Sequence, residues 1–235
     1  MRLSAPVHTL KRRARLLSRS EGIPLHEALD RIAAREGFAS WSLLSTRLSS
    51  ARPAAPSLAD LSEGDLLLLA ARPGQGKTRL GLQLLLDAAR EGRRAVFFTL
   101  EYTEAEARSL LHSLASGPLA ESPEIVATDD ISAALIVQHL GAAAPGTLAV
   151  IDYLQILDQQ RSKPPLSDQL AHLQDFARRS GVILCFLSQI DRSYDPALSA
   201  LPGPADLRLP NPVPEGVFSK ACFLHGGEIR LQPLV

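Results

Sequence analysis

One short segment carries the residue types that bind phosphate. Residues 71–78 read ARPGQGKT, which matches the pattern G-x-x-x-x-G-K-[ST] except that Ala71 replaces its first glycine. Gly74 and Gly76 let the backbone turn its N–H groups toward an anion. The Lys77 ammonium can reach the β- and γ-phosphates of a nucleotide, and the Thr78 hydroxyl can bind Mg²⁺. The segment therefore predicts a phosphate site made by Arg72, Pro73, Gly74, Gln75, Gly76, Lys77 and Thr78.

Three polar residues that follow apolar runs could complete this site. Asp152 ends the run LAVID, where its carboxylate could hold the water shell of the same Mg²⁺ as Thr78. Glu101 follows AVFFTL and could accept a proton from an attacking water. Gln189 follows VILCFLS, and its amide could hydrogen-bond the γ-phosphate or that water. We interpret Glu101 and Gln189 as catalytic; for all three residues the alternative is an ordinary strand end.

The elements that must position these residues begin near residue 58, where apolar runs alternate with helical periodicity. The expected strands are residues 66–70, 95–100, 125–127, 148–152 and 182–188. The expected helices are residues 77–90, 103–113, 131–141 and 167–179. Strands that are apolar throughout and alternate with helices are typical of an α/β fold with a mostly parallel central sheet. The carboxyl ends of such strands converge on one edge, so the candidate residues are expected to meet there.

Two further segments flank this pattern. Residues 191–214 hold six prolines and predict a long irregular loop, a kind of segment that is usually functional or mobile. Residues 218–224 and 229–231 flank Gly226-Gly227 and predict a hairpin near the end of the chain.

The N-terminal residues differ from the rest in charge. The whole chain has no net charge, yet residues 1–50 hold nine basic and four acidic residues. Five of the basic residues crowd into one stretch, namely Lys11, Arg12, Arg13, Arg15 and Arg19. Either this is a solvated helix face, or it contacts phosphates or an acidic surface of the rest of the chain.

Helical spacing divides the N-terminal stretch into three short helices. Leu10, Ala14 and Leu17 repeat on one face, Pro24 opens a second helix that Gly37 ends, and residues 38–48 form a third. The segment SSARPAAPS follows and reads as a linker. We therefore expect a small basic helical domain at 1–48, a linker at 49–57 and a larger domain at 58–235.

Composition excludes several classes of protein. Hydrophobic residues make up 46% and charged residues 21%, which is not the composition of a disordered chain. The longest apolar run, residues 66–71, is far shorter than the roughly 20 residues of a membrane span, so we expect no membrane partner. Cys185 and Cys222 lie in apolar runs without metal-ligand spacing, so buried thiols in a reducing cytoplasm are expected.

Five strings, in order, carry a family resemblance: ARPGQGKT, AVFFTLEYT, AVIDYLQIL, LCFLSQIDR and Asp206-Leu207-Arg208. Together they resemble the ATPase domain of DnaB-type replicative helicases, which have the RecA-like P-loop NTPase fold. The resemblance implies that Lys77, Thr78, Glu101, Asp152 and Gln189 bind and hydrolyse ATP with Mg²⁺. It gives Tyr153, Leu154 and Gln155 a positioning role. The first 48 residues resemble a small helical domain of glyoxalase-related bacterial proteins, which implies no activity here.

One family feature has no counterpart in the sequence. The family places an arginine finger, supplied by a neighbouring subunit, in a Lys-x-Arg setting near the end of the domain. The terminal segment FSKACFLHGGEIRLQPLV holds only Lys220 and Arg230, neither in that setting. Arg192, Arg208 or Arg230 could substitute. We therefore expect slow intrinsic hydrolysis and a ring that is weak or depends on a partner.

The leading hypothesis is an ATP-hydrolysing, DnaB-like protein that acts on or near DNA, with single-stranded DNA or a DNA-bound protein as partner. One alternative is a slow nucleotide-dependent switch or loader that does not unwind DNA. Another is a DNA-binding regulator in which the N-terminal helices contact DNA and the ATPase module regulates them.

Overall fold

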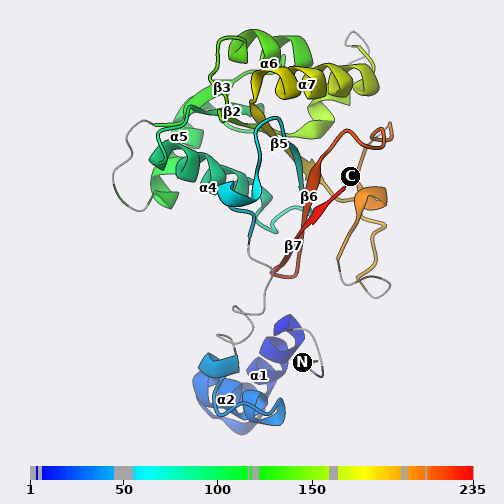
Figure 1. Cartoon of the computed structure of the whole chain (residues 1–235). Helices are drawn as coiled ribbons and strands as arrows, with labels where there is room; N and C mark the ends of the chain where they lie inside the picture. Colours follow the sequence, from blue (N-terminus) through cyan, green and yellow to red (C-terminus); the bar gives the residue numbers. More distant parts are fainter. Residues whose placement is uncertain are drawn as a thin grey trace. The chain divides into compact units, whose positions relative to one another are not determined.

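The computed structural model describes residues 4, 7–44, 55–115, 117, 122–158, 164–196, 199, 201–209 and 211–234. The chain forms two compact units, Met1–Pro53 and Ala54–Val235, each with its own hydrophobic core (Figure 1). Of the predicted linker at 49–57, only residues 55–57 are described. None of the helices in the described ranges combines the length and the apolar content that a bilayer span requires.

The smaller unit is built on a pair of helices, α1 (Val7–Glu21) and α2 (Leu25–Arg35). Leu10 and Ala14 of α1 are buried with Ala28 and Ile32 of α2. The helical spacing of these residues explains why one face of each helix is covered. As predicted, Gly37 ends α2: its φ is +85°, a left-handed conformation that favours glycine.

The predicted third helix begins later than expected. Residues 41–44 are helical, whereas Phe38 is not, and residues 45–48 lie outside the described part of the chain. The start is set by Asp30, whose Oδ1 accepts the Trp41 N–H at 2.7 Å. Ser40 Oγ also accepts the Leu43 N–H at 3.2 Å. These two contacts satisfy N–H groups that the first turn of a helix leaves without partners.

The larger unit contains a seven-stranded sheet in the order β3-β2-β4-β5-β1-β6-β7. The strands are β1 (Leu66–Ala71), β2 (Ala95–Thr99), β3 (Glu124–Ala127), β4 (Leu148–Asp152), β5 (Ile183–Gln189), β6 (Lys220–His225) and β7 (Glu228–Pro233). All neighbouring pairs are parallel except β6 and β7, which form the predicted hairpin. The predicted α/β fold with a mostly parallel sheet is confirmed.

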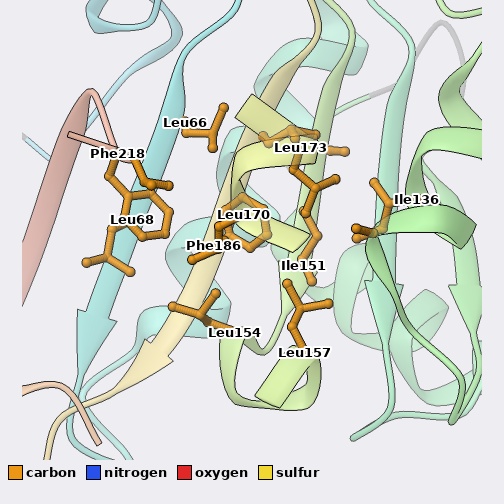
Figure 2. Close-up of a cluster of buried hydrophobic side chains, with 14 of the residues drawn as sticks. Leu66, Leu68, Ile136, Ile151, Leu154, Leu157, Leu170, Leu173, Phe186 and Phe218 are labelled. Atoms are coloured by element: carbon orange, nitrogen blue, oxygen red, sulfur yellow. The ribbon is translucent and has the colours of Figure 1, made fainter. Parts of the chain in front are cut away.

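Helices cover both faces of this sheet (Figure 1). They are α4 (Lys77–Arg90) and α5 (Glu104–Leu114) on one face, and α6 (Ala133–Leu140) and α7 (Leu166–Ser180) on the other. Leu66 and Leu68 of β1 pack toward α6 and α7, while Leu67 and Leu69 pack toward α4 and α5. Figure 2 shows Leu170 and Leu173 of α7 with the strand residues on their face. Burial on both sides explains why these strands are apolar at every position.

The proline-rich segment turns back onto the sheet. Among its described residues, Pro204–Asp206 forms the short 3-10 helix η3, and Leu207 makes an isolated antiparallel bridge to Ile190, just beyond β5. The Asp191 N–H donates to the Asp206 carbonyl at 2.7 Å. This segment is therefore held against the carboxyl end of β5.

Candidate nucleotide site

The carboxyl ends of four parallel strands lie side by side. Ala71 of β1 is in register with Gln189 of β5, and Asp152 of β4 is in register with Leu187 of β5 and with Thr99 of β2. Residues far apart in the sequence therefore meet at one edge of the sheet. This is the edge at which open parallel sheets bind ligands.

Residues 72–76 form the predicted phosphate loop between β1 and α4. Gly74 and Gly76 have φ values of +76° and +90°. No heavy atom outside the adjoining residues lies within 4 Å of a Cβ built at either position, so the dihedral angles, and not crowding by the protein, require glycine here. Because α4 begins at Lys77, the loop leads directly into the electropositive N-terminus of a helix.

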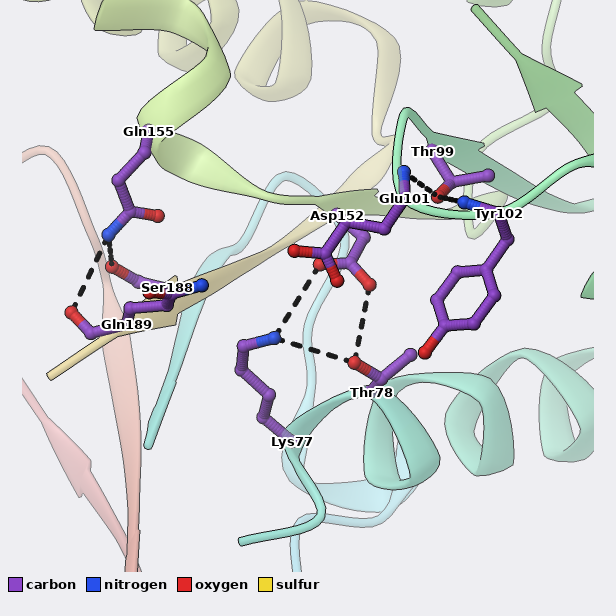
Figure 3. A network of polar contacts seen from close by, with 9 residues as sticks. All are labelled: Lys77, Thr78, Thr99, Glu101, Tyr102, Asp152, Gln155, Ser188 and Gln189. Atoms are coloured by element: carbon purple, nitrogen blue, oxygen red, sulfur yellow. Dashed lines mark hydrogen bonds and ion pairs between the residues drawn. The ribbon is translucent and has the colours of Figure 1, made fainter. Parts of the chain in front are cut away.

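Lys77, Thr78 and Asp152 form the polar centre of the site (Figure 3). Thr78 Oγ1 donates to Asp152 Oδ2 at 3.2 Å, and Lys77 Nζ lies 3.8 Å from Asp152 Oδ1. Lys77 Nζ also donates to Thr78 Oγ1 at 3.5 Å. Lys77 is 8% exposed and Asp152 is completely buried. The structure thus joins three side chains that the sequence assigned to one site.

Burial raises the pKa of Asp152 to about 6, and the Glu101 carboxylate raises it further while the Lys77 ammonium opposes the shift. Asp152 Oδ1 is buried and has no hydrogen-bond partner in the described part of the chain. Such an oxygen fits the water shell of Mg²⁺. The described residues contain no cluster of three or more His, Cys, Asp or Glu side chains that could hold a metal. Thr78 and Asp152 therefore fit Mg²⁺ whose remaining ligands come from water and nucleotide phosphates.

Glu101 lies at the rim of this centre (Figure 3). The predicted strand ends at Thr99 and not at Leu100. Thr99 Oγ1 accepts the N–H groups of Glu101 at 3.1 Å and Tyr102 at 3.3 Å, which turns the chain away from the sheet. Glu101 is consequently exposed while its carboxylate acts electrostatically on Asp152.

Tyr102 is a site residue that the sequence analysis missed. Its hydroxyl points toward Thr78 in Figure 3. Burial raises the pKa of Tyr102, and the carboxylates of Asp152 and Glu101 raise it further. The only sequence signal was its place beside Glu101, because the contact with Thr78 depends on how the chain turns after β2.

Gln189 ends β5, and its carbonyl oxygen accepts the Arg208 N–H at 2.8 Å. Gln155, from the short helix η2 (Leu154–Asp158), joins this strand end to the proline-rich segment. Its Nε2 donates to Ser188 Oγ at 3.0 Å and to the Arg208 carbonyl at 2.9 Å. A pocket of about 420 Å³ lies here, lined by Tyr153, Gln155, Gln189, Asp191, Leu207, Arg208 and Leu209.

Two side chains of the predicted phosphate loop are engaged elsewhere. Arg72 donates to the carbonyl oxygens of Arg192 at 2.9 Å and of Tyr194, and its guanidinium lies 5.4 Å from the centre of the Tyr194 ring. Gln75 Oε1 accepts the Gly226 N–H of the β6–β7 turn at 2.9 Å. These side chains anchor the loop to distant segments, while its backbone remains at the end of β1. Pro73 is exposed in the same loop.

The three candidate substitutes for the arginine finger lie in different places. Arg208 lines the pocket that also contains Gln189. Arg230 is exposed on β7. Arg192 follows β5, and its carbonyl accepts from Arg72. The other terminal cation, Lys220, is paired with Asp65.

No protein-family model matches the chain. The fold resembles the ATPase domain of a DnaB-like helicase, with 18% identity, a TM-score of 0.55, and coverage of 78% of this chain and 81% of that one. It also resembles a DnaB-like replicative helicase whose structure describes interactions with primase, again with 18% identity and a TM-score of 0.55. That match covers 93% of this chain and 66% of the helicase, so this chain spans just under two thirds of its length.

A third similar structure is a KaiC-like protein from Pyrococcus horikoshii OT3, with 22% identity, a TM-score of 0.49, and coverage of 68% of this chain and 70% of that one. The two DnaB-like matches and the sheet topology define the class: the larger unit has the RecA-like P-loop ATPase fold. The fold expected from the five sequence strings is confirmed.

Proposed function

We propose that this protein binds and hydrolyses ATP in a DnaB-like manner and acts on or near DNA. The observation that carries the proposal is the contact of Lys77, Thr78 and Asp152 where a glycine-rich loop enters α4. A buried lysine, a hydroxyl and a carboxylate at the N-terminus of a helix suit a Mg²⁺-bound nucleotide triphosphate.

Each residue has a distinct part in this proposal. The loop N–H groups and Lys77 hold the β- and γ-phosphates, while Thr78 and Asp152 hold Mg²⁺, which when bound neutralises phosphate charge. Glu101, exposed at the rim, accepts a proton from the attacking water. Gln189 hydrogen-bonds the γ-phosphate or that water from the neighbouring strand end. The phosphate is thereby held at the strand ends while the water approaches from the rim.

Action on DNA is the finer part of the proposal. It is supported by the likeness of the fold to DnaB-like ATPase domains, one of which is described with primase. We propose single-stranded DNA or a DNA-bound protein as the partner, and a ring of subunits that is weak or depends on that partner. The cytoplasm is the proposed compartment, because Cys185 and Cys222 are buried free thiols.

One observation favours a second candidate function, a slow nucleotide-dependent switch or loader that does not unwind DNA. Of the two cations on the terminal strands, Lys220 is already paired with Asp65, which leaves Arg230 to approach a neighbouring subunit. A single exposed arginine outside the family's Lys-x-Arg setting favours slow turnover. Stimulation of ATP hydrolysis by single-stranded DNA distinguishes the two candidates, because only the first requires it.

The test of nucleotide binding is Lys77→Ala, with Arg79→Ala as the matched control. Both changes remove one cation from the first turn of α4, but Lys77 is buried beside Asp152 whereas Arg79 is exposed. Loss of a charge-assisted phosphate contact, worth about 1.5–3 kcal/mol, lowers ATP affinity at least tenfold. Titration with a fluorescent ATP analogue measures the affinity. Equal affinity of the two variants, both folded, contradicts the proposed site.

A further inference from the structure

Helix α1 carries a stripe of four cations: Lys11, Arg12, Arg15 and Arg19. Successive helix residues are rotated by about 100°, so Lys11, Arg15 and Arg19 follow one line along the helix and Arg12 lies beside it. All four side chains are exposed. The three residues of the line are spaced about 6 Å apart along the helix axis.

These cations have no ion pair among the described residues, in contrast to their neighbours. Arg31 of α2 pairs with Glu21 at 2.6 Å and with Glu27 at 2.8 Å. Arg13, on another side of α1, acts electrostatically on Glu36. Helix α1 has no acidic residue before Glu21 at its end. The stripe therefore presents positive charge that its own unit does not neutralise.

The apolar face of α1 is already in use. Leu10 and Ala14 are buried against α2, and Leu16, which is 55% exposed, is the large apolar residue of α1 that remains at the surface. A helix that lies in a membrane interface needs a free apolar face to insert. This helix offers charge without such a face, which favours a hydrated polyanion over a lipid surface.

We propose that this stripe binds the phosphate backbone of single-stranded nucleic acid. Three of its four residues are arginines, whose planar guanidinium groups match phosphate geometry, and a row of cations can contact successive phosphates without reading bases. The proposal assigns a DNA-contacting surface outside the ATPase unit, and it rests on the proposed function only for the choice of nucleic acid as partner. The competing partner is the protein's own second unit, since residues 54–235 hold 15 basic and 21 acidic residues.

The test uses the full chain without nucleotide. Binding of a fluorescein-labelled oligothymidylate is followed by fluorescence anisotropy between about 50 and 200 mM salt. Arg15→Gln combined with Arg19→Gln weakens binding several-fold and makes the slope of log affinity against log salt shallower by about 1.4, because each single-strand phosphate contact contributes about 0.7. Arg31→Gln combined with Arg35→Gln removes the same charge from the same unit and leaves the slope unchanged.

Several results overturn the stripe. These are an equal change in both double variants, an unchanged slope in the Arg15/Arg19 variant, or binding of the wild type to phosphatidylserine vesicles but not to the oligonucleotide. A gain of oligonucleotide affinity in the Arg15/Arg19 variant also overturns it, because that result means the stripe docks on the acidic second unit. Circular dichroism checks folding, and Arg15→Lys combined with Arg19→Lys retains the slope. Absence of ATP turnover in the wild type contradicts the proposed function alone, because this titration contains no nucleotide.

Discussion

At the scale of single residues, Asp152 shows how the site is prepared for a cation. Its carboxylate is buried and receives hydrogen bonds or charge from only Thr78 and Lys77. Burial raises the pKa of Asp152 to about 6, which reflects a charge that lacks full compensation. A bound cation would supply that compensation, so the electrostatics of the protein favour the same ligand as the motif.

The residue-scale prediction separates ATP binding from chemistry. Glu101→Gln keeps ATP affinity and lowers turnover by about 10²–10⁴-fold, because the amide cannot accept the proton of water. Glu104→Gln is the matched control, since Glu104 is exposed nearby in the first turn of α5 and pairs with Arg108. Phosphate release and analogue binding are measured for both. If Glu101→Gln still turns over while Asp152→Asn does not, Glu101 has only a structural role.

At the scale of elements, the end of β5 is the junction of the larger unit. Gln155 holds Ser188 of β5 and the Arg208 carbonyl of the proline-rich segment through one amide group. Arg208 in turn donates its N–H to Gln189. A movement of the segment would therefore reach the backbone of the candidate catalytic residue Gln189.

The element-scale prediction concerns this junction. Gln155→Leu lowers the free energy of unfolding by about 1–3 kcal/mol, because it leaves buried acceptors at Ser188 and Arg208 without their donor. Urea denaturation measures the change, and hydrogen exchange of residues 201–209 increases. Gln138→Leu, at an exposed position of α6, changes stability by no more than about 0.5 kcal/mol. Equal stability of the two variants means that the junction does not depend on this amide.

At the scale of the whole molecule, the arrangement of cations limits what one chain can do alone. Arg208 lines a pocket with Gln189, Arg230 is exposed on β7, and Lys220 is held by Asp65. In related phosphoryl-transfer systems an arginine supplied to the γ-phosphate contributes about 10³–10⁵ in rate. A chain without a dedicated arginine is therefore expected to hydrolyse ATP slowly.

The molecule-scale prediction follows from this expectation. The purified full chain with ATP and Mg²⁺ hydrolyses slowly, does not form a stable hexamer and does not unwind a forked DNA by itself. Turnover, particle mass and strand separation are measured on the same preparation, with Lys77→Ala as the inactive control. A stable hexamer that unwinds the fork contradicts the prediction, and loss of that activity in Arg208→Ala or Arg230→Ala identifies the arginine that substitutes for the finger.

The sequence alone predicted the elements and most of the candidate site. Apolar strands, helical periodicity and the capping box of Thr103 and Glu106 are local signals, and the strands, helices and cap are present in the structure. The string ARPGQGKT located the phosphate loop, because positive φ at Gly74 and Gly76 needs particular residues at particular positions. The roles of Glu101, Asp152 and Gln189 and the domain boundaries stay predictions.

Only the tertiary structure decided which distant segments meet. The order β3-β2-β4-β5-β1-β6-β7 places Gln189 beside Ala71 and Asp152 beside Thr99, and no local pattern specifies such an order. The contact of Tyr102 with Thr78 and the links from Arg72 to Tyr194 and from Gln75 to Gly226 depend on the same arrangement. Local signals determine backbone conformation over a few residues, whereas these contacts arise from burying both faces of one sheet, a property of the chain as a whole.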